Sequence, residues 1–223
     1  MISGGGLACT RLASRARRSS RTLGVDHLRV KAAVFLDRDG VLTRLVPDPI
    51  SGQYESPLTL EQVTLLPGAA AAVRRLRDVG YVVVGISNQP AAAKGVVELG
   101  ELERIQARVL ELLGRDSAAP DAFRLCFHHP EGSVPLLTLE CDCRKPAPGM
   151  LLEAAEELEI DLGASWMVGD TDGDVLAGAA AGCRTLLIDN PGSAHKRAGF
   201  AHADAGVPDL ATAVEIIVDM DKR

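Results

Sequence analysis

Aromatic residues are scarce in this chain, making up 3% of its 223 residues. Hydrophobic residues nevertheless account for 47%, so the core must be built mainly from aliphatic side chains and alanine. No apolar run is long enough for a membrane-spanning helix, and residues 1–30 lack the apolar stretch of a secretory signal peptide. We therefore expect a soluble, cytoplasmic protein with no membrane partner.

Positive charge prevails only at the start of the chain. Residues 1–31 carry a net charge of +6, whereas the whole chain carries −6 and the remainder −12. An acidic body argues against nucleic-acid binding. Residues 1–30 are rich in glycine, serine and arginine; a transit peptide would fit this composition, but a disordered basic tail or an upstream start codon fits better. The length then suits one domain over residues 31–223.

From residue 31 onward, short apolar runs alternate with helical patterns. In one of these patterns, Leu102, Ile105 and Val109 recur close to the helical period of 3.6. Such alternation predicts an α/β fold, a Rossmann-like doubly wound parallel sheet with right-handed crossovers. Residues 43–65 are predicted to form a loop with one short strand or turn, too short for a separate cap domain. The expected strands are 33–36, 81–86, 122–127, 166–168 and 185–188, and the expected helices are 69–78, 99–113, 148–158, 174–181 and 208–218.

Two carboxylates follow the first of these strands. Asp37 and Asp39 stand at its carboxyl end, where open α/β sheets bind their ligands. Two acids this close repel each other unless a cation or a shared proton intervenes. A hard cation such as Mg²⁺, which prefers carboxylate oxygens, would satisfy both.

Polar groups recur at the ends of other predicted strands. The motifs Asp37-x-Asp39, Ser87-Asn88, Lys145-Pro146 and Gly169-Asp170-x-x-x-Asp174 appear in that order. In these motifs and their strand contexts the chain resembles the haloacid-dehalogenase-like (HAD-like) phosphohydrolases over residues 33–190. The resemblance implies hydrolysis of a phosphate ester in a HAD-like phosphatase domain spanning residues 31–223.

The resemblance also implies roles for the acids. Asp37 would be the nucleophile that forms an aspartyl-phosphate, which divides one difficult step into two easier ones. Asp39 would protonate the leaving oxygen and then take a proton from the attacking water. Mg²⁺ would be held by Asp37, by the backbone carbonyl of Asp39 and by Asp170.

The remaining motif residues would bind the phosphoryl group. By the same resemblance, Ser87 and the backbone of Asn88 would donate hydrogen bonds to phosphoryl oxygens, and Lys145 would supply a positive charge. Asp174 has two interpretations. It either orients a neighbour such as Lys145, or it is an acid at a helix N-terminus, where the helix dipole favours negative charge.

A second cluster of polar residues precedes Lys145. The chain has five cysteines, an odd number, and three of them fall within Cys126-x-His128-His129 and Cys141-x-Cys143. Three sulfurs and one imidazole match a closed tetrahedral Zn²⁺ site, which predicts a structural zinc-binding loop. Either histidine could be the fourth ligand; the family pattern places the ligand at His128.

The string from His128 to Val134, followed by residues 141–146, resembles the branch that contains heptose-bisphosphate and histidinol-phosphate phosphatases. It looks most like the D-glycero-D-manno-heptose 1,7-bisphosphate phosphatases. In that family the residue matching Arg144 contributes to substrate recognition, and a guanidinium suits a second phosphate bidentately. Three features depart from the family pattern: Pro90-Ala91 replaces a Ser-Gly pair, Thr171 stands where some members carry lysine, and residues 44–48 differ.

The expected function is therefore a Mg²⁺-dependent phosphomonoesterase that removes the 7-phosphate of this heptose bisphosphate. A histidinol-phosphate phosphatase is the alternative, and a non-catalytic domain that binds phosphorylated metabolites is a further one. A polynucleotide 3′-phosphatase fits less well because the body is acidic. We expect a monomer with a small phosphorylated sugar as its substrate.

Overall fold

The computed structural model describes residues 9–13, 31–49 and 51–220. A seven-stranded sheet runs through these residues in the order β1-β6-β5-β2-β7-β8-β9. All neighbouring strands pair in parallel except β1, which is antiparallel to β6. The strands are β1 (Cys9–Ala13), β2 (Ala33–Leu36), β5 (Val82–Asn88), β6 (Ala122–Cys126), β7 (Trp166–Gly169), β8 (Arg184–Ile188) and β9 (Ala205–Val207).

The order of the parallel strands creates a crevice in the middle of the sheet. Counted along the chain, they are arranged 3-2-1-4-5-6, an order typical of the doubly wound sheet predicted from the sequence. The chain moves outward from β2 in one direction and from its neighbour β7 in the other. Ligands of such sheets bind at this switch point, outside the carboxyl ends of the two strands. Asp37 and Asp170 follow those two strands.

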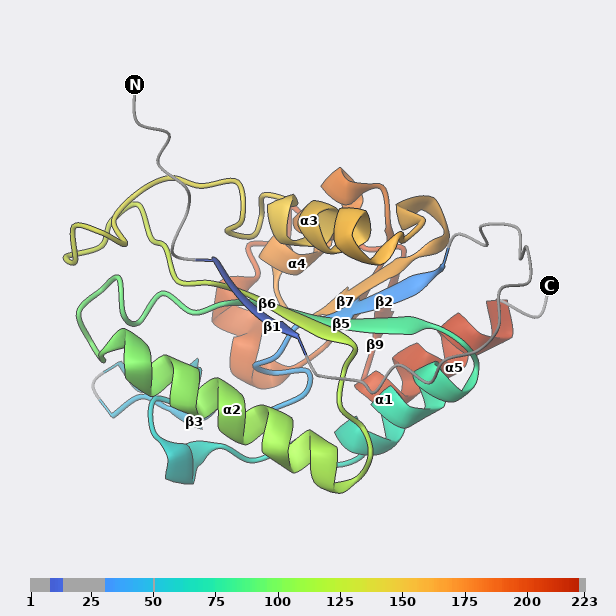
Figure 1. Cartoon of the computed structure of the whole chain (residues 1–223), viewed down its shortest axis with the longest axis horizontal. Helices are drawn as coiled ribbons and strands as arrows, with labels where there is room; N and C mark the ends of the chain where they lie inside the picture. Colours follow the sequence, from blue (N-terminus) through green and yellow to red (C-terminus); the bar gives the residue numbers. More distant parts are fainter. Residues whose placement is uncertain (1–8, 14–30, 50, 221–223) are drawn as a thin grey trace, which may run out of the picture.

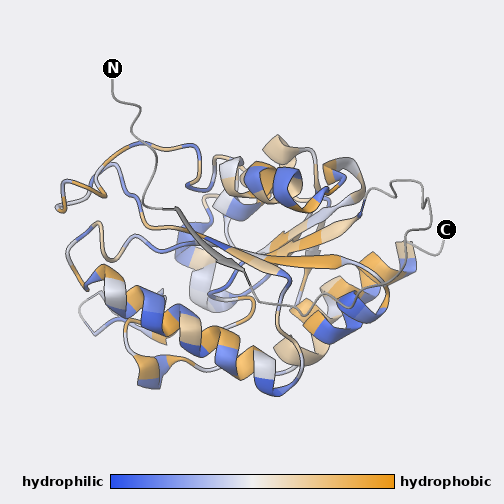
Figure 2. Cartoon of the chain, in the orientation of Figure 1, coloured by the Kyte–Doolittle hydropathy of each residue, from blue (hydrophilic) through white to orange (hydrophobic). Residues whose placement is uncertain are grey.

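Five α-helices of the described residues cover the two faces of the sheet (Figure 1). On one face, α1 (Ala69–Asp78), α2 (Leu99–Arg115) and α5 (Leu210–Met220) contribute buried residues to one core. On the other, α3 (Gly149–Leu158) and α4 (Asp172–Ala181) contribute to a second core. Figure 2 shows hydrophobic residues concentrated on the strands between these helical layers. Leu102, Ile105 and Val109 are fully buried, as their spacing predicts.

Predicted and observed elements agree to within about two residues at most ends, the usual uncertainty of helix and strand boundaries. Strands β9 and β1 are not among the elements predicted from the sequence. Strand β1 lies within residues 1–30, for which the sequence predicts a disordered basic tail. Residues 1–8 and 14–30 are outside the described part of the chain, and for them disorder stays a prediction.

Residues 43–65 hold more structure than the predicted loop. They contain the antiparallel pair β3 (Val46–Pro47) and β4 (Tyr54–Glu55), followed by the short 3₁₀ helix η1 (Leu60–Gln62). Another 3₁₀ helix, η3 (Pro191–Lys196), follows β8, and β4 packs against it. As predicted, no separate cap domain occurs among the described residues; this hairpin stands beside the switch point instead.

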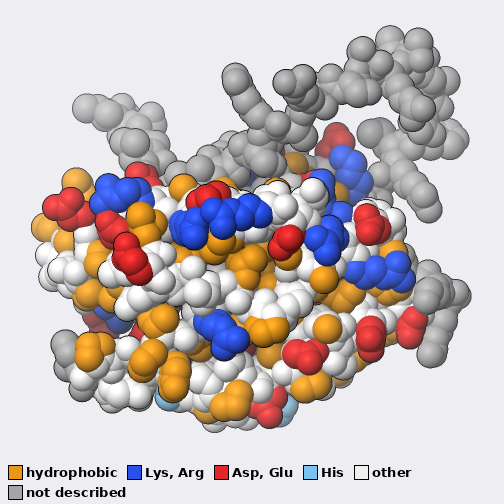
Figure 3. All heavy atoms as spheres, turned by 90° about the horizontal axis from the view of Figure 1, so that it is seen from below, with side chains coloured by type: hydrophobic (Ala, Val, Ile, Leu, Met, Phe, Trp, Pro, Cys, Tyr) orange, Lys and Arg blue, Asp and Glu red, His pale blue; other side chains and the backbone are white. Residues whose placement is uncertain are grey.

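The surface seen from the side of α1 and α2 mixes charges of both signs (Figure 3). On α2, for example, Arg108 pairs with Glu111 at 2.7 Å, and Arg115 pairs with the same carboxylate at 2.5 Å. Positive charge is thus interspersed with negative charge on this face, where nucleic-acid binding would favour a continuous basic patch. Within the described residues, no helix has the length and apolar character needed to cross a bilayer.

Candidate active site

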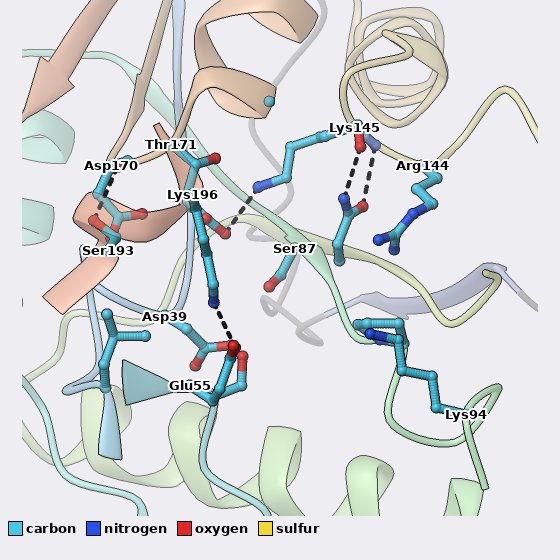
Figure 4. Close-up of a pocket in the computed structure, with 16 residues that line it drawn as sticks. Asp39, Glu55, Ser87, Lys94, Arg144, Lys145, Asp170, Thr171, Ser193 and Lys196 are labelled. Carbon is cyan, nitrogen blue, oxygen red and sulfur yellow. Dashed lines mark hydrogen bonds and ion pairs between the residues drawn. The ribbon is translucent and has the colours of Figure 1, made fainter. Parts of the chain in front are cut away.

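A single cavity collects the polar residues predicted from separate motifs. Its volume is about 330 Å³, and Figure 4 shows it with its lining side chains. The residues come from the carboxyl ends of β2, β5 and β7 and from the loop before α3, because parallel strands present these ends at the same edge. Its lining includes all the predicted catalytic and phosphate-binding residues: Asp37, Asp39, Ser87, Asn88, Arg144, Lys145 and Asp170.

Lys145 is buried at the base of this cavity and has three acceptors around its ammonium group. Its Nζ lies 2.9 Å from Asp37 Oδ1 and 2.5 Å from Asp174 Oδ1, and it donates to the carbonyl of Ile86 at 3.0 Å. Burial lowers the pKa of Lys145, but Asp174 and Asp37 outweigh burial and raise it above its usual value. The lysine is therefore a fixed positive charge beside Asp37.

One oxygen of the Asp37 carboxylate has two partners. Its Oδ1 accepts a hydrogen bond from the backbone N–H of Arg38 at 2.7 Å in addition to the contact with Lys145. Burial and the charge of Asp174 raise the pKa of Asp37 to about 7, against the lowering effect of Lys145. Several acids thus share a buried space with one lysine, an arrangement in which a further cation would relieve repulsion.

Asp170 provides the observation that points to a cation. Its carboxylate is 1% exposed, and neither oxygen has a hydrogen-bond partner among the described residues. Burial, together with Asp37 and Asp174, raises the pKa of Asp170 well above its ordinary range. Buried carboxylate oxygens are seldom left without a partner, and oxygen atoms are the ligands that Mg²⁺ prefers.

The third acid of this group, Asp174, is already engaged. Ligand atoms of Asp37, Asp170 and Asp174 all lie within 4.8 Å of one another. Asp174 Oδ1 contacts Lys145, and its Oδ2 accepts from the backbone and hydroxyl of Thr171 at 3.0 and 2.6 Å. The bond from the Thr171 backbone is part of a capping box at the N-terminus of α4. Both interpretations of Asp174 therefore hold, and Asp37 and Asp170 are the acids that fit a cation.

Gly40 allows the first strand and Asp170 to approach each other. Its φ of +91° is in the left-handed region, which glycine adopts readily. A Cβ at this position would lie 1.9 Å from Asp170 Oδ2. The glycine of the Asp37-Arg38-Asp39-Gly40 motif thus allows the chain to turn and leaves room for the unpartnered carboxylate of Asp170.

The carboxylate of Asp39 is surrounded by donors. Oδ1 accepts from Arg38 Nε at 3.0 Å and from Thr43 Oγ1 at 2.8 Å. Oδ2 accepts from Arg38 Nη2 at 2.8 Å and from Gln89 Nε2 at 2.6 Å. Although burial acts to raise the pKa of Asp39, Arg38 and the other donors lower it below the usual value. Asp39 is therefore ionised and held in one orientation at the edge of the cavity.

Ser87 and Asn88 end β5 at the cavity. The Ser87 hydroxyl is buried and accepts from Gln89 Nε2 at 2.9 Å. The side chain of Asn88 is held by the loop before α3: it donates to the Lys145 carbonyl at 2.9 Å and accepts from the Lys145 backbone N–H at 3.1 Å. Asn88 thus fixes the loop that carries the lysine.

The cysteine and histidine motifs also converge. Ligand atoms of Cys126, His128, Cys141 and Cys143 lie within 4.8 Å of one another, and the sulfur pairs are separated by 3.2 to 3.7 Å. A tetrahedron with Zn–S bonds of about 2.3 Å has edges of about 3.8 Å, so the four groups fit a zinc ion. His129 is outside the cluster; its Nδ1 accepts from the backbone of Glu131. A hydrogen bond from Cys143 lowers the pKa of Cys126 to about 6, which favours the thiolate form that metals bind.

Comparisons with known proteins agree with this geometry. The sequence profile of the HAD-hydrolase-like family matches residues 142–213. The D-glycero-beta-D-manno-heptose-1,7-bisphosphate 7-phosphatase of Rhodopseudomonas palustris is 36% identical over 152 residues, which is 68% of this chain and 80% of the relative. The enzyme of the same name from Yersinia pestis is 33% identical over 172 residues, which is 77% of this chain and 87% of the relative.

The chain belongs to the HAD-like phosphatases. Enzymes of this group hydrolyse phosphate monoesters, and the family here is that of the heptose-bisphosphate phosphatases just named. A crystal structure of the D,D-heptose 1,7-bisphosphate phosphatase of B. bronchiseptica, complexed with magnesium and phosphate, superposes with a TM-score of 0.70. It is 27% identical in sequence, and the match covers 85% of this chain and 99% of that one.

In this HAD-like phosphatase the cysteine cluster and the active site are joined through Arg144. The residue follows Cys143 directly, lines the cavity and donates through Nη1 to the His128 carbonyl at 3.3 Å. Burial lowers the pKa of Arg144, while the neighbouring thiols act in the opposite direction. A metal that holds the cluster together would therefore also fix the base of this side chain.

Several residues of the phosphatase cavity were not predicted from the sequence. Glu55, Lys94, Ser193 and Lys196 all line it. They come from the hairpin, from the segment after β5 and from η3, none of which carries a motif or a periodic pattern. Their presence could not be inferred locally, because only the folded chain brings these segments to the same edge of the sheet.

Proposed function

We propose that the protein is a Mg²⁺-dependent phosphomonoesterase that acts through an aspartyl-phosphate and removes the 7-phosphate of D-glycero-D-manno-heptose 1,7-bisphosphate. One observation carries the proposal: Asp37 faces the fixed ammonium of Lys145 and the unpartnered carboxylate of Asp170 in one cavity. These are a nucleophile, a positive charge for the phosphoryl oxygens and a ligand for a cation. The names of the relatives supply the substrate.

In the proposed reaction Asp37 attacks phosphorus and the leaving oxygen departs with a proton. Lys145, Ser87 and the backbone of Asn88 contact the phosphoryl oxygens, whose charge is spread in the transition state. Asp39 provides the proton and later accepts one from the water that hydrolyses the aspartyl-phosphate. Because Asp39 is ionised in the free enzyme, it must take up that proton or change its contacts when the substrate binds.

Asp37, Asp170 and the backbone carbonyl of Asp39 would hold Mg²⁺. When bound, the ion neutralises charge on the nucleophile and the phosphate, which would otherwise repel each other. The four ligands of the cysteine cluster would hold Zn²⁺ in a closed site with no position for a substrate, so its role is structural. It would order the segment from 128 to 143 that leads into Arg144 and Lys145.

The substrate would lie between the hairpin, η3 and the zinc loop, in an open site without a cap domain. A cavity of about 330 Å³ can accommodate a phosphorylated sugar. Cationic side chains on its lining suit an anionic substrate, and Arg144 would contact the second phosphate bidentately. Residues 31–223 would form one catalytic domain that works as a monomer.

Released phosphate measured with a panel of substrates tests the proposal. The purified protein in Mg²⁺ should hydrolyse the heptose 1,7-bisphosphate with a higher kcat/KM than histidinol phosphate. Asp37→Asn should abolish turnover while the circular dichroism spectrum stays unchanged. A preference for histidinol phosphate would refute the substrate, and the absence of phosphatase activity with every member of the panel would refute the mechanism.

A further inference from the structure

The cavity has a buried base and an exposed rim. Asp37, Lys145 and Asp170 at the base are 8%, 6% and 1% exposed. Glu55 and Lys196 at the rim have side chains 42% and 31% exposed. If the reacting phosphate binds at the base, as the proposed function requires, the far end of the substrate must lie at the rim.

At the rim Lys196 and Glu55 form an ion pair between two distant segments. Lys196 Nζ lies 2.6 Å from Glu55 Oε2, and His195 Nε2 lies 3.4 Å from Glu55 Oε1. Glu55 ends β4 and Lys196 ends η3, and these two elements pack against each other. Figure 4 shows the Lys196 side chain extending across the cavity toward Glu55.

Glu55 adds a negative charge to the rim of a cavity whose proposed substrate is an anion. The other lining acids, Asp37, Asp39 and Asp170, belong to the proposed catalytic and metal-binding group. A carboxylate at the rim repels the far end of a substrate that carries a second phosphate, unless that end displaces it. Exposed lysine–carboxylate pairs are weak, whereas an ammonium forms strong charge-assisted hydrogen bonds with a phosphate dianion. Lys196 can therefore exchange one anion for the other.

We propose that Lys196, in addition to Arg144, gives the site its specificity for a bisphosphorylated substrate: it binds the phosphate that does not react, and Glu55 is its partner while the cavity is free. This inference rests on the proposed function and adds a residue and a mechanism of discrimination to it. Phosphate binding releases Lys196 from Glu55, so a substrate without a second phosphate leaves the original pair in place.

Two substrates that differ only in the second phosphate provide the test. Heptose 1,7-bisphosphate and heptose 7-phosphate lose the same phosphate from the same oxygen. Lys196→Gln should lower kcat/KM for the bisphosphate by roughly ten- to hundredfold, the range of a hydrogen bond to a charged group, mainly through KM. The same variant should change kcat/KM for the monophosphate by no more than about twofold. Glu55→Gln should lower KM for the bisphosphate alone, since the competing carboxylate is gone.

Lys94→Gln is the matched control, because Lys94 also lines the cavity but is exposed and comes from the segment after β5. It should change the ratio of kcat/KM for the two substrates less than Lys196→Gln does. Equal losses on both substrates in Lys196→Gln, or a selective loss in Lys94→Gln alone, would overturn the inference while leaving the proposed function intact. If the wild type hydrolysed neither heptose phosphate, the proposed function and the inference with it would fail.

Discussion

Arg38 binds the carboxylate of Asp39 with two parallel hydrogen bonds, from Nε at 3.0 Å and from Nη2 at 2.8 Å. The guanidinium is fully buried, and its Nη1 donates to Gln106 Oε1 on α2 at 3.1 Å. Arginine is rarely buried unless it is paired. The residue between the two motif acids therefore fixes the direction of the proposed acid–base residue and connects it to a helix of the core.

This contact predicts a dependence on the leaving group. Arg38→Lys removes the bidentate pair, so Asp39 should protonate alkoxide leaving groups less well. We expect kcat for a sugar phosphate to fall by roughly tenfold or more, and kcat for p-nitrophenyl phosphate, whose leaving group needs little protonation, to change less. Arg104→Lys, at a 62% exposed position of α2, is the control. An equal fall for both substrates would indicate only a structural role for Arg38.

The pair between Lys145 and Asp174 predicts a stability effect. Both side chains are buried, and Asp174→Asn leaves the ammonium with one charged partner fewer. Breaking a buried ion pair costs about 3 kcal/mol or more, which urea unfolding followed by the fluorescence of Trp166 would measure. Glu101→Gln breaks the exposed pair with Arg104 and should cost less than about 1 kcal/mol. If the two variants lost similar amounts of unfolding free energy, the buried pair of Lys145 and Asp174 at the base of the cavity would be contradicted.

Ala substitutions at Gly40 and Gly80 distinguish the cost of backbone strain from an effect on the position of Asp170. Both have positive φ, +91° and +100°, but a Cβ would contact Asp170 only at Gly40; at Gly80 nothing lies within 4 Å. Each Ala substitution should cost about 1–2 kcal/mol from the left-handed backbone. Only Gly40→Ala should also raise the Mg²⁺ concentration needed for half-maximal activity, because it displaces the unpartnered carboxylate. A normal Mg²⁺ dependence in Gly40→Ala would count against Asp170 as a ligand.

The cysteine cluster predicts bound metal. Elemental analysis of the purified protein should find about one zinc per chain, and Cys141→Ser should lose it and lower the melting temperature. Activity should fall as well, since the segment that ends at Arg144 loses its anchor. Cys183→Ser alters a buried cysteine outside the cluster and should keep the zinc. Full zinc content in Cys141→Ser would exclude that residue as a ligand.

Local sequence patterns determined where most strands and helices of this protein lie along the chain. The helix over residues 69–78 and the strands around 33–36 and 166–169 were predictable because side-chain periodicity and glycine punctuation act within a few residues. Strand ends in a parallel sheet meet at one edge, so the meeting of Asp37, Ser87 and Asp170 followed once the alternation of strands and helices was recognised. Lys145 lies in the loop before α3, and its place beside them followed only from the resemblance. The choice between His128 and His129 depended on resemblance, and the observed cluster agrees with it.

Only the tertiary structure decided how these groups are paired and what surrounds them. The hydrogen bond that Arg38 donates to Gln106 joins residues 68 positions apart, and the pair of Glu55 with Lys196 joins residues 141 positions apart. Neither contact leaves a local pattern, since each depends on how a helix or a hairpin packs against the sheet. Strands β1 and β9 escaped prediction for the same reason: they lie at the two edges of the sheet, and an edge strand depends on the neighbour with which it pairs as well as on its own sequence.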